Sequence, residues 1–470
     1  MKKRIRVDRD RSRINRRDFV KSGGAALAGG VVLGRAPIPE STVRSESSGA
    51  SSLFPVQPSQ AGRIQSYRTL GRTGFRVSDI SLGGSFLREP NVVRYACDKG
   101  INYIDTSEYY ENGGADRAIR GALQYFERDK IFIATNADIR PREEKEAVLT
   151  RARRSLERLG TDYIDAYLMG SVSTVDWLNA PGYHAAMDQL KAEGRVRFTG
   201  VTYHGSEATD QTGMADVLCA AVEDGRFDVL LFVYNFLNHS EGDRIIAAAK
   251  ANNVGTTAMK TAPGKLRAEP FDPDNLSEVF QQYLTAMMRT GSSRAAALRE
   301  LRTYSDAQNE FVARTQVFAE RYGIENEEAL QLASIQWVLQ NPDMHTACIS
   351  AWNFDFIDKI VALSGTRLTA PAEELLQEAG SALENQYCRH GCVECMDSCP
   401  FGVPVSKIMR FAYYFEGQGQ ERHAMSKYAA LDGSGAEPCK DCAGLCTGAC
   451  RYGLNIQANM LHVHDLLTLT

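Results

Sequence analysis

The 470-residue sequence has no long apolar run, no excess of positive charge and no glycine-rich dinucleotide motif after a predicted strand. The apolar stretch Gly23–Gly34 has about twelve residues, whereas a helix that spans a bilayer needs about 20. The formal charge is −4, from 54 Lys/Arg and 58 Asp/Glu. This balance repels phosphate backbones and excludes nucleic acid as a partner. The missing glycine motif argues against an open, doubly wound sheet.

The N-terminal segment is strongly basic. Nine Lys/Arg precede Asp18, and the run Asn15–Lys21 is followed by the apolar stretch Gly23–Gly34. This order resembles a twin-arginine export signal, with Arg16 and Arg17 as the arginine pair. The resemblance implies that the twin-arginine translocase exports the folded, cofactor-loaded protein to the periplasm or cell envelope.

Cleavage of this signal would make the protein more acidic. Removing residues 1–36 deletes eleven Lys/Arg and three Asp and changes the formal charge from −4 to −12. Gly34 and Ala36 suit a cleavage site, but Pro37 follows directly, so an uncleaved signal that anchors the protein stays an alternative. A basic arm for nucleic acid is another alternative, which the order of basic, apolar and Ser/Pro-rich segments disfavours. Residues 37–66 are rich in Ser, Pro and Gln and predict a flexible linker.

Eight of the eleven cysteines form two quartets near the C-terminus. Thiolates at such short spacings select iron–sulfur clusters, zinc or Cu(I). The first quartet ends in Cys399 before a proline and resembles the bacterial ferredoxin run, in which the last cysteine of each run ligates the other cluster. The second is looser, because three residues separate Cys442 from Cys446 and Arg451 replaces the proline. We predict a ferredoxin-like domain over residues 366–470 with two 4Fe-4S clusters; zinc and disulfides are the alternatives. The quartets are Cys388, Cys392, Cys395 and Cys399, then Cys439, Cys442, Cys446 and Cys450.

The middle of the chain has the pattern of repeated strand–helix units. Short apolar runs alternate with longer amphipathic segments from Tyr67 to about Leu363. One predicted helix, Glu143–Leu159, has an apolar face and is followed by Gly160 as a stop signal. Eight units in about 300 residues predict an α/β fold of the (β/α)8 TIM barrel type, with a doubly wound sheet as the alternative. The predicted strands end near Gly84, Asp105, Thr135, Met169, Thr202, Asn235, Lys260 and Ser350.

Four stretches of residues 67–365 resemble the aldo-keto reductases, and one branch of that family carries a C-terminal ferredoxin-like extension. The resemblance implies carbonyl reduction with a nicotinamide cofactor, by an Asp, Tyr, Lys, His tetrad at the C-terminal mouth of the barrel. Asp105 and Tyr110 match the first two members. Asn136 and Gly170 stand where the family has Lys and His. The four stretches are Tyr67–Ser78, Gly100–Tyr110, Leu156–Asp165 and Glu193–Val201.

The two departures change the expected chemistry. A tyrosine of pKa about 10 acts near neutral pH only if a nearby cation or dipole stabilises the phenolate. Positioned acid–base catalysis contributes about 10²- to 10⁴-fold, so we expect the loss of the lysine to weaken the family reaction severely. The alternative is that Asp105 is a satisfied carboxylate at a strand end and Tyr110 a packed aromatic side chain.

The expected cofactor pocket departs from the family as well. Asp355 and Asp358 follow the eighth strand, where the family places basic or small polar residues around the adenosine phosphate, and this counts against NADP. Tyr234 and Asn235 resemble the family's ending of the sixth strand. Together with Ser350 at the end of the eighth, they are the candidate cofactor-binding residues.

His204, after the fifth strand, and Lys260, at the end of the seventh, are further catalytic candidates, because catalytic groups of TIM barrels lie at such strand ends. A capping histidine and a solvated lysine are the alternatives. Residues 261–326 are an insertion far longer than the usual two to six residues of such a loop, about 65 in length. We expect this insertion to form a helical subdomain that covers the mouth or packs on the cluster domain. The remaining cysteines, Cys97, Cys219 and Cys348, are expected to be buried without chemistry.

Together these features predict an exported oxidoreductase in which two 4Fe-4S clusters transfer electrons to or from an aldo-keto-reductase-like barrel. One alternative is a non-enzymatic iron–sulfur electron carrier or scaffold with an inactive barrel. Another is a zinc-stabilised binding protein. The sequence identifies neither the small-molecule substrate nor the redox partner.

Overall fold

The computed structural model describes residues 62–468, with gaps at 206–211, 264–270, 277–279, 282–283, 285–287, 289–292, 300, 304, 307–326, 386, 419, 432 and 434. The predicted signal, with Arg16 and Arg17, lies outside the described residues, as do most of the predicted linker and of the insertion. The following description concerns the unit of residues 51–470. None of the helices between residues 62 and 468 that the structure describes has the length and apolar character needed to cross a membrane.

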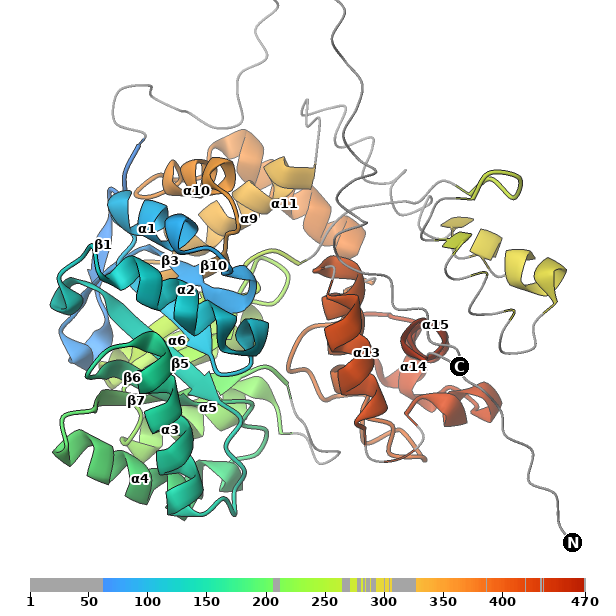
Figure 1. Ribbon diagram of the computed structural model, residues 1–470. Helices are drawn as coiled ribbons and strands as arrows, with labels where there is room; N and C mark the ends of the chain where they lie inside the picture. The colour runs from blue at the N-terminus through green and yellow to red at the C-terminus, as the bar shows by residue number, and fades with distance from the viewer. Residues whose placement is uncertain are drawn as a thin grey trace, which may run out of the picture. The chain divides into compact units, whose positions relative to one another are not determined.

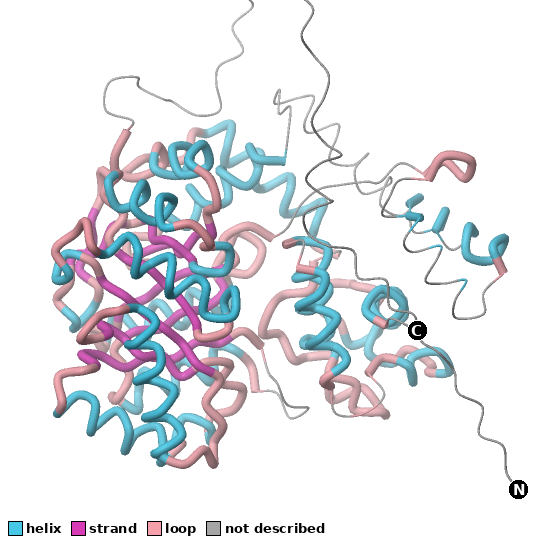
Figure 2. Tube along the Cα trace, in the orientation of Figure 1, coloured by secondary structure: helices cyan, strands magenta, loops and turns pink. Residues whose placement is uncertain are grey.

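Eight parallel strands close into a barrel in the order β10-β3-β4-β5-β6-β7-β8-β9 (Figures 1 and 2). Each strand ends within two residues of its predicted position, so the predicted TIM barrel is confirmed. The strands are β3 (Ile80–Gly83), β4 (Tyr103–Ser107), β5 (Phe132–Ala137), β6 (Ile164–Met169), β7 (Val196–Tyr203), β8 (Val229–Val233), β9 (Gly255–Met259) and β10 (Thr346–Ser350).

Amphipathic helices cover the outside of the barrel (Figure 2). The helix predicted over Glu143–Leu159 is α3, which begins two residues later, at Lys145. It buries its apolar face and ends at Gly160, whose φ of +60° is the left-handed conformation that glycine adopts readily. The other helices of this layer are α1 (Pro90–Asp98), α2 (Gly114–Leu123), α4 (Pro181–Ala192), α5 (Met214–Asp224), α6 (Ser240–Ala251), α9 (Glu327–Gln340) and α10 (Phe354–Val361).

An antiparallel hairpin, β1 (Tyr67–Thr69) and β2 (Arg76–Ser78), packs against the N-terminal end of the barrel. Leu70 and Val77 form one buried cluster with side chains from the first residues of the barrel strands, including Tyr103 and Phe132. Function in such barrels is located at the opposite end, where the strands finish.

The C-terminal region contains two groups of helices. The first helix, α11 (Ala370–Leu383), shares a buried apolar cluster with α9 and therefore belongs to the helical layer of the barrel, although the sequence boundary at residue 365 separated them. The later elements surround a core of their own that includes Ile408, Phe411 and Met460. These are α12 (Val405–Ala412), the π-helical turn η6 (Tyr413–Gly417), α13 (Glu421–Ala429), the 3-10 turn η7 (Glu437–Asp441), α14 (Leu445–Ala449) and α15 (Ile456–Leu467).

No strand follows β10 in the described residues. In the described residues this region therefore lacks the strands of a ferredoxin-like fold.

Candidate functional site

The carboxyl ends of β7 and β9 bring two of the predicted catalytic residues together. His204 follows β7 and Lys260 follows β9, and Lys260 Nζ lies 3.2 Å from His204 Nδ1. Lys260 has a φ of +49°, an uncommon backbone conformation for a residue other than glycine. The side-chain amide of Asn235 donates a hydrogen bond of 2.9 Å to the Lys260 carbonyl. Asn235 therefore positions the lysine backbone.

Burial and neighbouring positive charge lower the pKa values of both Lys260 and His204. Burial, followed by the positive charge of Arg410, lowers the pKa of Lys260 to about 7. Burial, followed by the charges of Lys260 and Arg410, holds the pKa of His204 well below its usual range. A lysine that is about half protonated at pH 7, beside a neutral imidazole, can accept and donate protons near neutral pH.

Asp105 and Tyr110 lie close to each other but are not poised to ionise. Asp105 on β4 is 3% exposed. Burial raises its pKa to about 8, against a hydrogen bond from Asn136 that lowers it. Burial, and then the charge of Asp105, raises the pKa of Tyr110 well above its usual value. At neutral pH the tyrosine is therefore a hydrogen-bond donor and the carboxyl is mostly protonated.

The structure gives a steric reason for one of the two departures from the family tetrad. A Cβ atom on Gly170 would lie 2.8 Å from the carbonyl oxygen of Ala137 and 3.0 Å from Asp138 Oδ1, so a histidine does not fit here without a backbone shift. At the lysine position, the Asn136 amide donates a hydrogen bond of 3.0 Å to the carbonyl oxygen of Thr106. This amide supplies no positive charge that would stabilise a phenolate.

The predicted cofactor-binding residues do not all meet at the mouth. The Tyr234 hydroxyl donates to Asp243 Oδ1 at 2.8 Å and accepts from the Asn341 amide at 2.9 Å, and its ring packs on Trp337. These contacts lie in the layer of α6 and α9, on the outer side of β8. Ser350 Oγ, at the end of β10, lies 2.7 Å from Ser85 Oγ.

The acidic segment after β10 is partly neutralised. The Asp358 carboxylate lies 2.8 Å from Lys99 Nζ and accepts a hydrogen bond of 2.9 Å from the Tyr95 hydroxyl. Its charge therefore repels a phosphate less than the sequence suggests.

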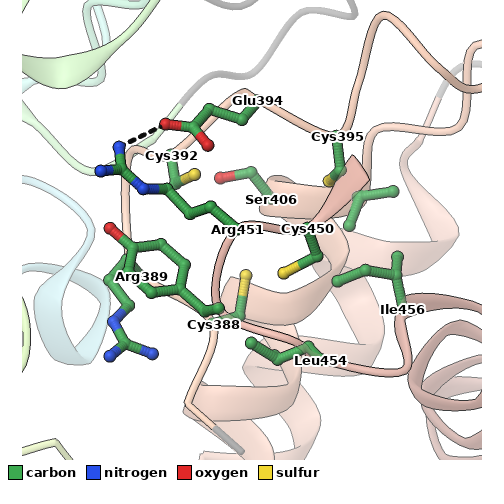
Figure 3. A pocket seen from close by; sticks show the side chains of 12 residues that line it. Cys388, Arg389, Cys392, Glu394, Cys395, Ser406, Cys450, Arg451, Leu454 and Ile456 are labelled. Carbon is green, nitrogen blue, oxygen red and sulfur yellow. Dashed lines mark hydrogen bonds and ion pairs between the residues drawn. The ribbon is translucent and has the colours of Figure 1, made fainter. Parts of the chain in front are cut away.

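Thiols from both cysteine quartets line one cavity in the C-terminal region (Figure 3). Three come from the first quartet and one from the second, and their sulfur atoms point into the same space. The cavity volume is about 20 Å³, more than the roughly 10–15 Å³ that one water needs. An ion pair of 2.6 Å between Arg451 and Glu394 lies beside it. The four thiols are those of Cys388, Cys392, Cys395 and Cys450.

The other four thiols are neighbours of one another. Burial raises the pKa of Cys439 to about 11, and the nearby thiols of Cys399, Cys446 and Cys442 contribute to this increase. Burial and two of the same neighbours, Cys399 and Cys442, also raise the pKa of Cys446. The last cysteine of each quartet thus lies with the first three of the other. None of the eleven cysteines, all of which lie among the described residues, forms a disulfide.

Zinc and iron–sulfur clusters can both be bound by sets of four cysteines. Zinc holds four thiolates at about 2.3 Å from a single ion, and no group of three or more His, Cys, Asp or Glu in the described residues is arranged to hold one metal ion. A 4Fe-4S cluster is bound by four cysteines spread around an inorganic core. In this structure, four thiols drawn from both quartets surround one cavity.

The loop between Cys388 and Cys392 contacts the barrel. Arg389 Nε donates a hydrogen bond of 3.2 Å to the carbonyl of Leu237, which follows β8. Gly391 has a φ of +86°, and a Cβ atom there would lie 2.7 Å from the Met214 side chain. The close approach to α5 and the backbone conformation both require glycine.

Residues of the C-terminal region also reach the pair of His204 and Lys260. Arg410 on α12 donates to the carbonyl oxygens of His204, at 2.7 Å, and Gly205, at 2.6 Å. The ring of Tyr414 faces Lys260 Nζ, which lies 5.8 Å from the ring centroid. Tyr414 also contributes to raising the pKa of Tyr110. Sequence reasoning missed Arg410 and Tyr414, and no sequence signal marks them.

His390 was also missed. It is 6% exposed, and its ring packs edge-on against Tyr413 with centroids 4.9 Å apart. Its position between two cluster-type cysteines is a signal that could have drawn attention to it.

The three remaining cysteines lie in the barrel. Burial raises the pKa of Cys97 to about 12 and that of Cys348 well above its usual value, so both stay protonated. Cys219 on α5 is only partly buried.

Comparison with known proteins gives a consistent result for the barrel. A model of the aldo/keto reductase family matches residues 88–379. The L-galactose dehydrogenase of Arabidopsis thaliana is 31% identical over 229 residues, which are 44% of this chain and 68% of the plant protein. An uncharacterised oxidoreductase of Bacillus subtilis is 30% identical over 149 residues, 29% of this chain and 48% of that protein. A methylglyoxal reductase of Escherichia coli is 32% identical over 117 residues, 24% of this chain and 38% of that protein.

The chain thus spans less than half the length of these two bacterial relatives. An aldo/keto reductase from Klebsiella pneumoniae, solved with NADP and acetate, is 18% identical; the match covers 67% of this chain and 95% of that chain, with a TM-score of 0.45. The family match covers more than half of the chain and includes seven of the eight barrel strands. We conclude that this protein belongs to the aldo/keto reductase family.

Proposed function

We propose that this protein is an exported oxidoreductase that interconverts a carbonyl and an alcohol in its barrel and exchanges the electrons through two 4Fe-4S clusters. The observation that carries the proposal is the crossed grouping of the cysteines. The loop that bears Cys388 and Cys392 also touches the barrel through Arg389. Export through the twin-arginine translocase is supported by the sequence of residues 1–36.

The chain's own groups can handle the protons of such a reaction. Converting an alcohol to a carbonyl releases two electrons and two protons, and the reverse reaction takes them up. Two bound clusters would accept or supply one electron each. Lys260, with a pKa of about 7, can exchange the proton of the substrate oxygen, and Tyr110, which stays protonated, can donate a hydrogen bond to that oxygen.

The proposal assigns no exchangeable nicotinamide cofactor. Asn136 and Gly170 replace the lysine and histidine of the family, and Asp355 adds negative charge after β10. Although Asp358 is paired with Lys99, Asp355 adds negative charge where the resemblance implies basic surroundings for a 2′-phosphate.

The decisive experiment measures iron and redox activity in the anaerobically purified full chain. We expect about eight iron atoms per chain and clusters that dithionite reduces. Lys260→Met should abolish substrate-dependent cluster reduction or oxidation and leave the iron content unchanged. Stoichiometric zinc without iron would refute the proposal. Lys130→Met, on the loop before β5, is the control because it removes an exposed lysine at the other end of the barrel.

A second candidate function is an electron carrier with an inactive barrel. The absence of space for a histidine at Gly170 favours it, because the family chemistry cannot be restored there without backbone movement. In that case the clusters would be reduced and reoxidised at the same rates in the parent protein and in Lys260→Met, with every small carbonyl or alcohol tested.

A further inference from the structure

The ends of β7 and β9, together with the C-terminal region, gather positively charged and imidazole groups around one point. Lys260 Nζ and His204 Nδ1 are 3.2 Å apart, and Arg410 is bound to the backbone of His204 and Gly205. Aromatic contacts link His390 to the same place, because its ring packs on Tyr413, Tyr413 packs on Tyr414, and the ring of Tyr414 faces Lys260 Nζ. The elements that supply these groups are β7, β9, α12 and the loop between Cys388 and Cys392.

In the described part of the chain, no carboxylate contacts the Nζ atom of Lys260. Lys260 Nζ contacts His204 Nδ1, the Met259 sulfur at 3.5 Å and the face of Tyr414. The carboxylate of Asp138 accepts a hydrogen bond of 2.8 Å from the Ser171 hydroxyl and lies 3.8 Å from Lys427 Nζ. Buried charges in proteins are ordinarily paired, so the ammonium form of Lys260 needs a negative charge that the described residues do not supply.

A second observation points to a ligand at the same place. His390 Nε2 is buried and has no hydrogen-bond partner in the described residues. A buried polar atom without a partner costs about 1–3 kcal/mol, so such atoms usually mark a water, an ion or a ligand group. The charge of Lys260 acts on this imidazole, so one acceptor group placed between the two side chains would be a partner for both.

We propose that this cluster of Lys260, His204, His390 and Arg410 binds an oxyanion, a carboxylate or phosphate carried by a small molecule. We further propose that this molecule is the substrate, so the oxidoreductase acts on an anionic hydroxy or oxo compound. This second step rests on the proposed function, whereas binding of the anion does not.

Anion binding at this place has a proton signature. The pKa of free Lys260 is about 7, so at pH 8 most molecules carry a neutral amine. A bound anion favours the ammonium form and raises this pKa. Binding at pH 8 should therefore take up close to one proton per site. The charged or titratable groups that face the lysine from other elements are Arg410 and His390. The charge of Lys427 acts on His204.

The test is calorimetric titration of the cluster-loaded full chain at pH 8, in two buffers of different ionisation enthalpy. The probes are oxalate, inorganic phosphate and NADP, with glycerol as a neutral control. We expect oxalate or phosphate to bind with proton uptake and glycerol not to bind. In Lys260→Met the dissociation constant should rise at least about tenfold, the effect of about 1.4 kcal/mol. Lys130→Met should bind like the parent protein.

A second variant separates charge from proton uptake and guards against misfolding of the first. Lys260→Arg keeps a charge that does not titrate, so it should bind the anion without taking up a proton. Binding of neither oxalate nor phosphate, or binding that is the same in Lys260→Met, would overturn the oxyanion site. Binding of NADP alone that depends on Lys260 would overturn the assignment to the substrate. Iron analysis of the same samples reports separately on the clusters, so failure of the proposed function is distinguishable.

Discussion

Because the last cysteine of each quartet lies with the first three of the other, we expect different pairs of cysteine substitutions to have different effects. Cys395 and Cys450 belong to different quartets in the sequence but line the same cavity (Figure 3). Cys446 belongs to the same quartet as Cys450 but neighbours Cys399 and Cys442. We compare the double variant Cys395→Ser/Cys450→Ser with the double variant Cys395→Ser/Cys446→Ser.

The expected magnitude follows from four thiols in each set. A serine hydroxyl is a poorer ligand for iron than a thiolate, so a single substitution should remove or damage one cluster, about four of about eight iron atoms. Cys395→Ser/Cys450→Ser removes two ligands from one cluster and should still lose only about four. Cys395→Ser/Cys446→Ser removes one ligand from each cluster and should lose about eight.

The assay is iron per folded chain after anaerobic reconstitution, with electron paramagnetic resonance of the reduced protein. Cys219→Ser, a partly buried cysteine of the barrel, is the matched control and should keep all of its iron. If Cys395→Ser/Cys450→Ser lost both clusters, as Cys395→Ser/Cys446→Ser is expected to, each quartet would bind its own cluster, and our reading of the cavity would be refuted.

Three further predictions follow from individual residues. Arg16→Lys/Arg17→Lys should keep the folded protein in the cytoplasm, because the pair is read by geometry as well as by charge; unchanged export in a fractionation assay would contradict this. Free NADPH should not support turnover, since Asn136 and Gly170 replace the tetrad Lys and His; micromolar binding followed by tryptophan fluorescence, or cluster reduction by NADPH at catalytic rates, would show the opposite. The folded pKa of Asp105 is raised to about 8, so its contribution to stability is present below about pH 4 and lost as the pH rises through about 8. Asp105→Asn should therefore flatten the fall in melting temperature between about pH 5 and pH 9, and a slope equal to that of the parent protein would count against a buried, protonated carboxyl.

The sequence was sufficient for the barrel because each strand is a short apolar run that ends in polar residues. Alternation of such runs with amphipathic helices depends on local patterns, which a sequence displays directly. The sequence did not assign α11 to the barrel, because the helix it packs against, α9, lies about thirty residues earlier in the chain. Packing between distant segments leaves no local pattern.

The candidate site was predictable in part for the same reason. His204 and Lys260 could be named because TIM barrels place functional groups at strand ends. Their distance of 3.2 Å and the influence of Arg410 come from the docking of α12 on the barrel, which no spacing encodes. Tyr234 shows the opposite case, because a matching motif did not reveal that its hydroxyl is engaged by Asp243 and Asn341.

The gap between Cys388 and Cys392 holds three residues, one more than the ferredoxin spacing of two. Two of the three, Arg389 and Gly391, contact the barrel side, and the third is His390. The loop with the extra residue thus lies against the barrel. Deleting one residue of this gap should leave four thiols able to hold a cluster while cutting the connection to the barrel. Under the proposed function, the spacing of this loop also determines which domain exchanges electrons with the clusters.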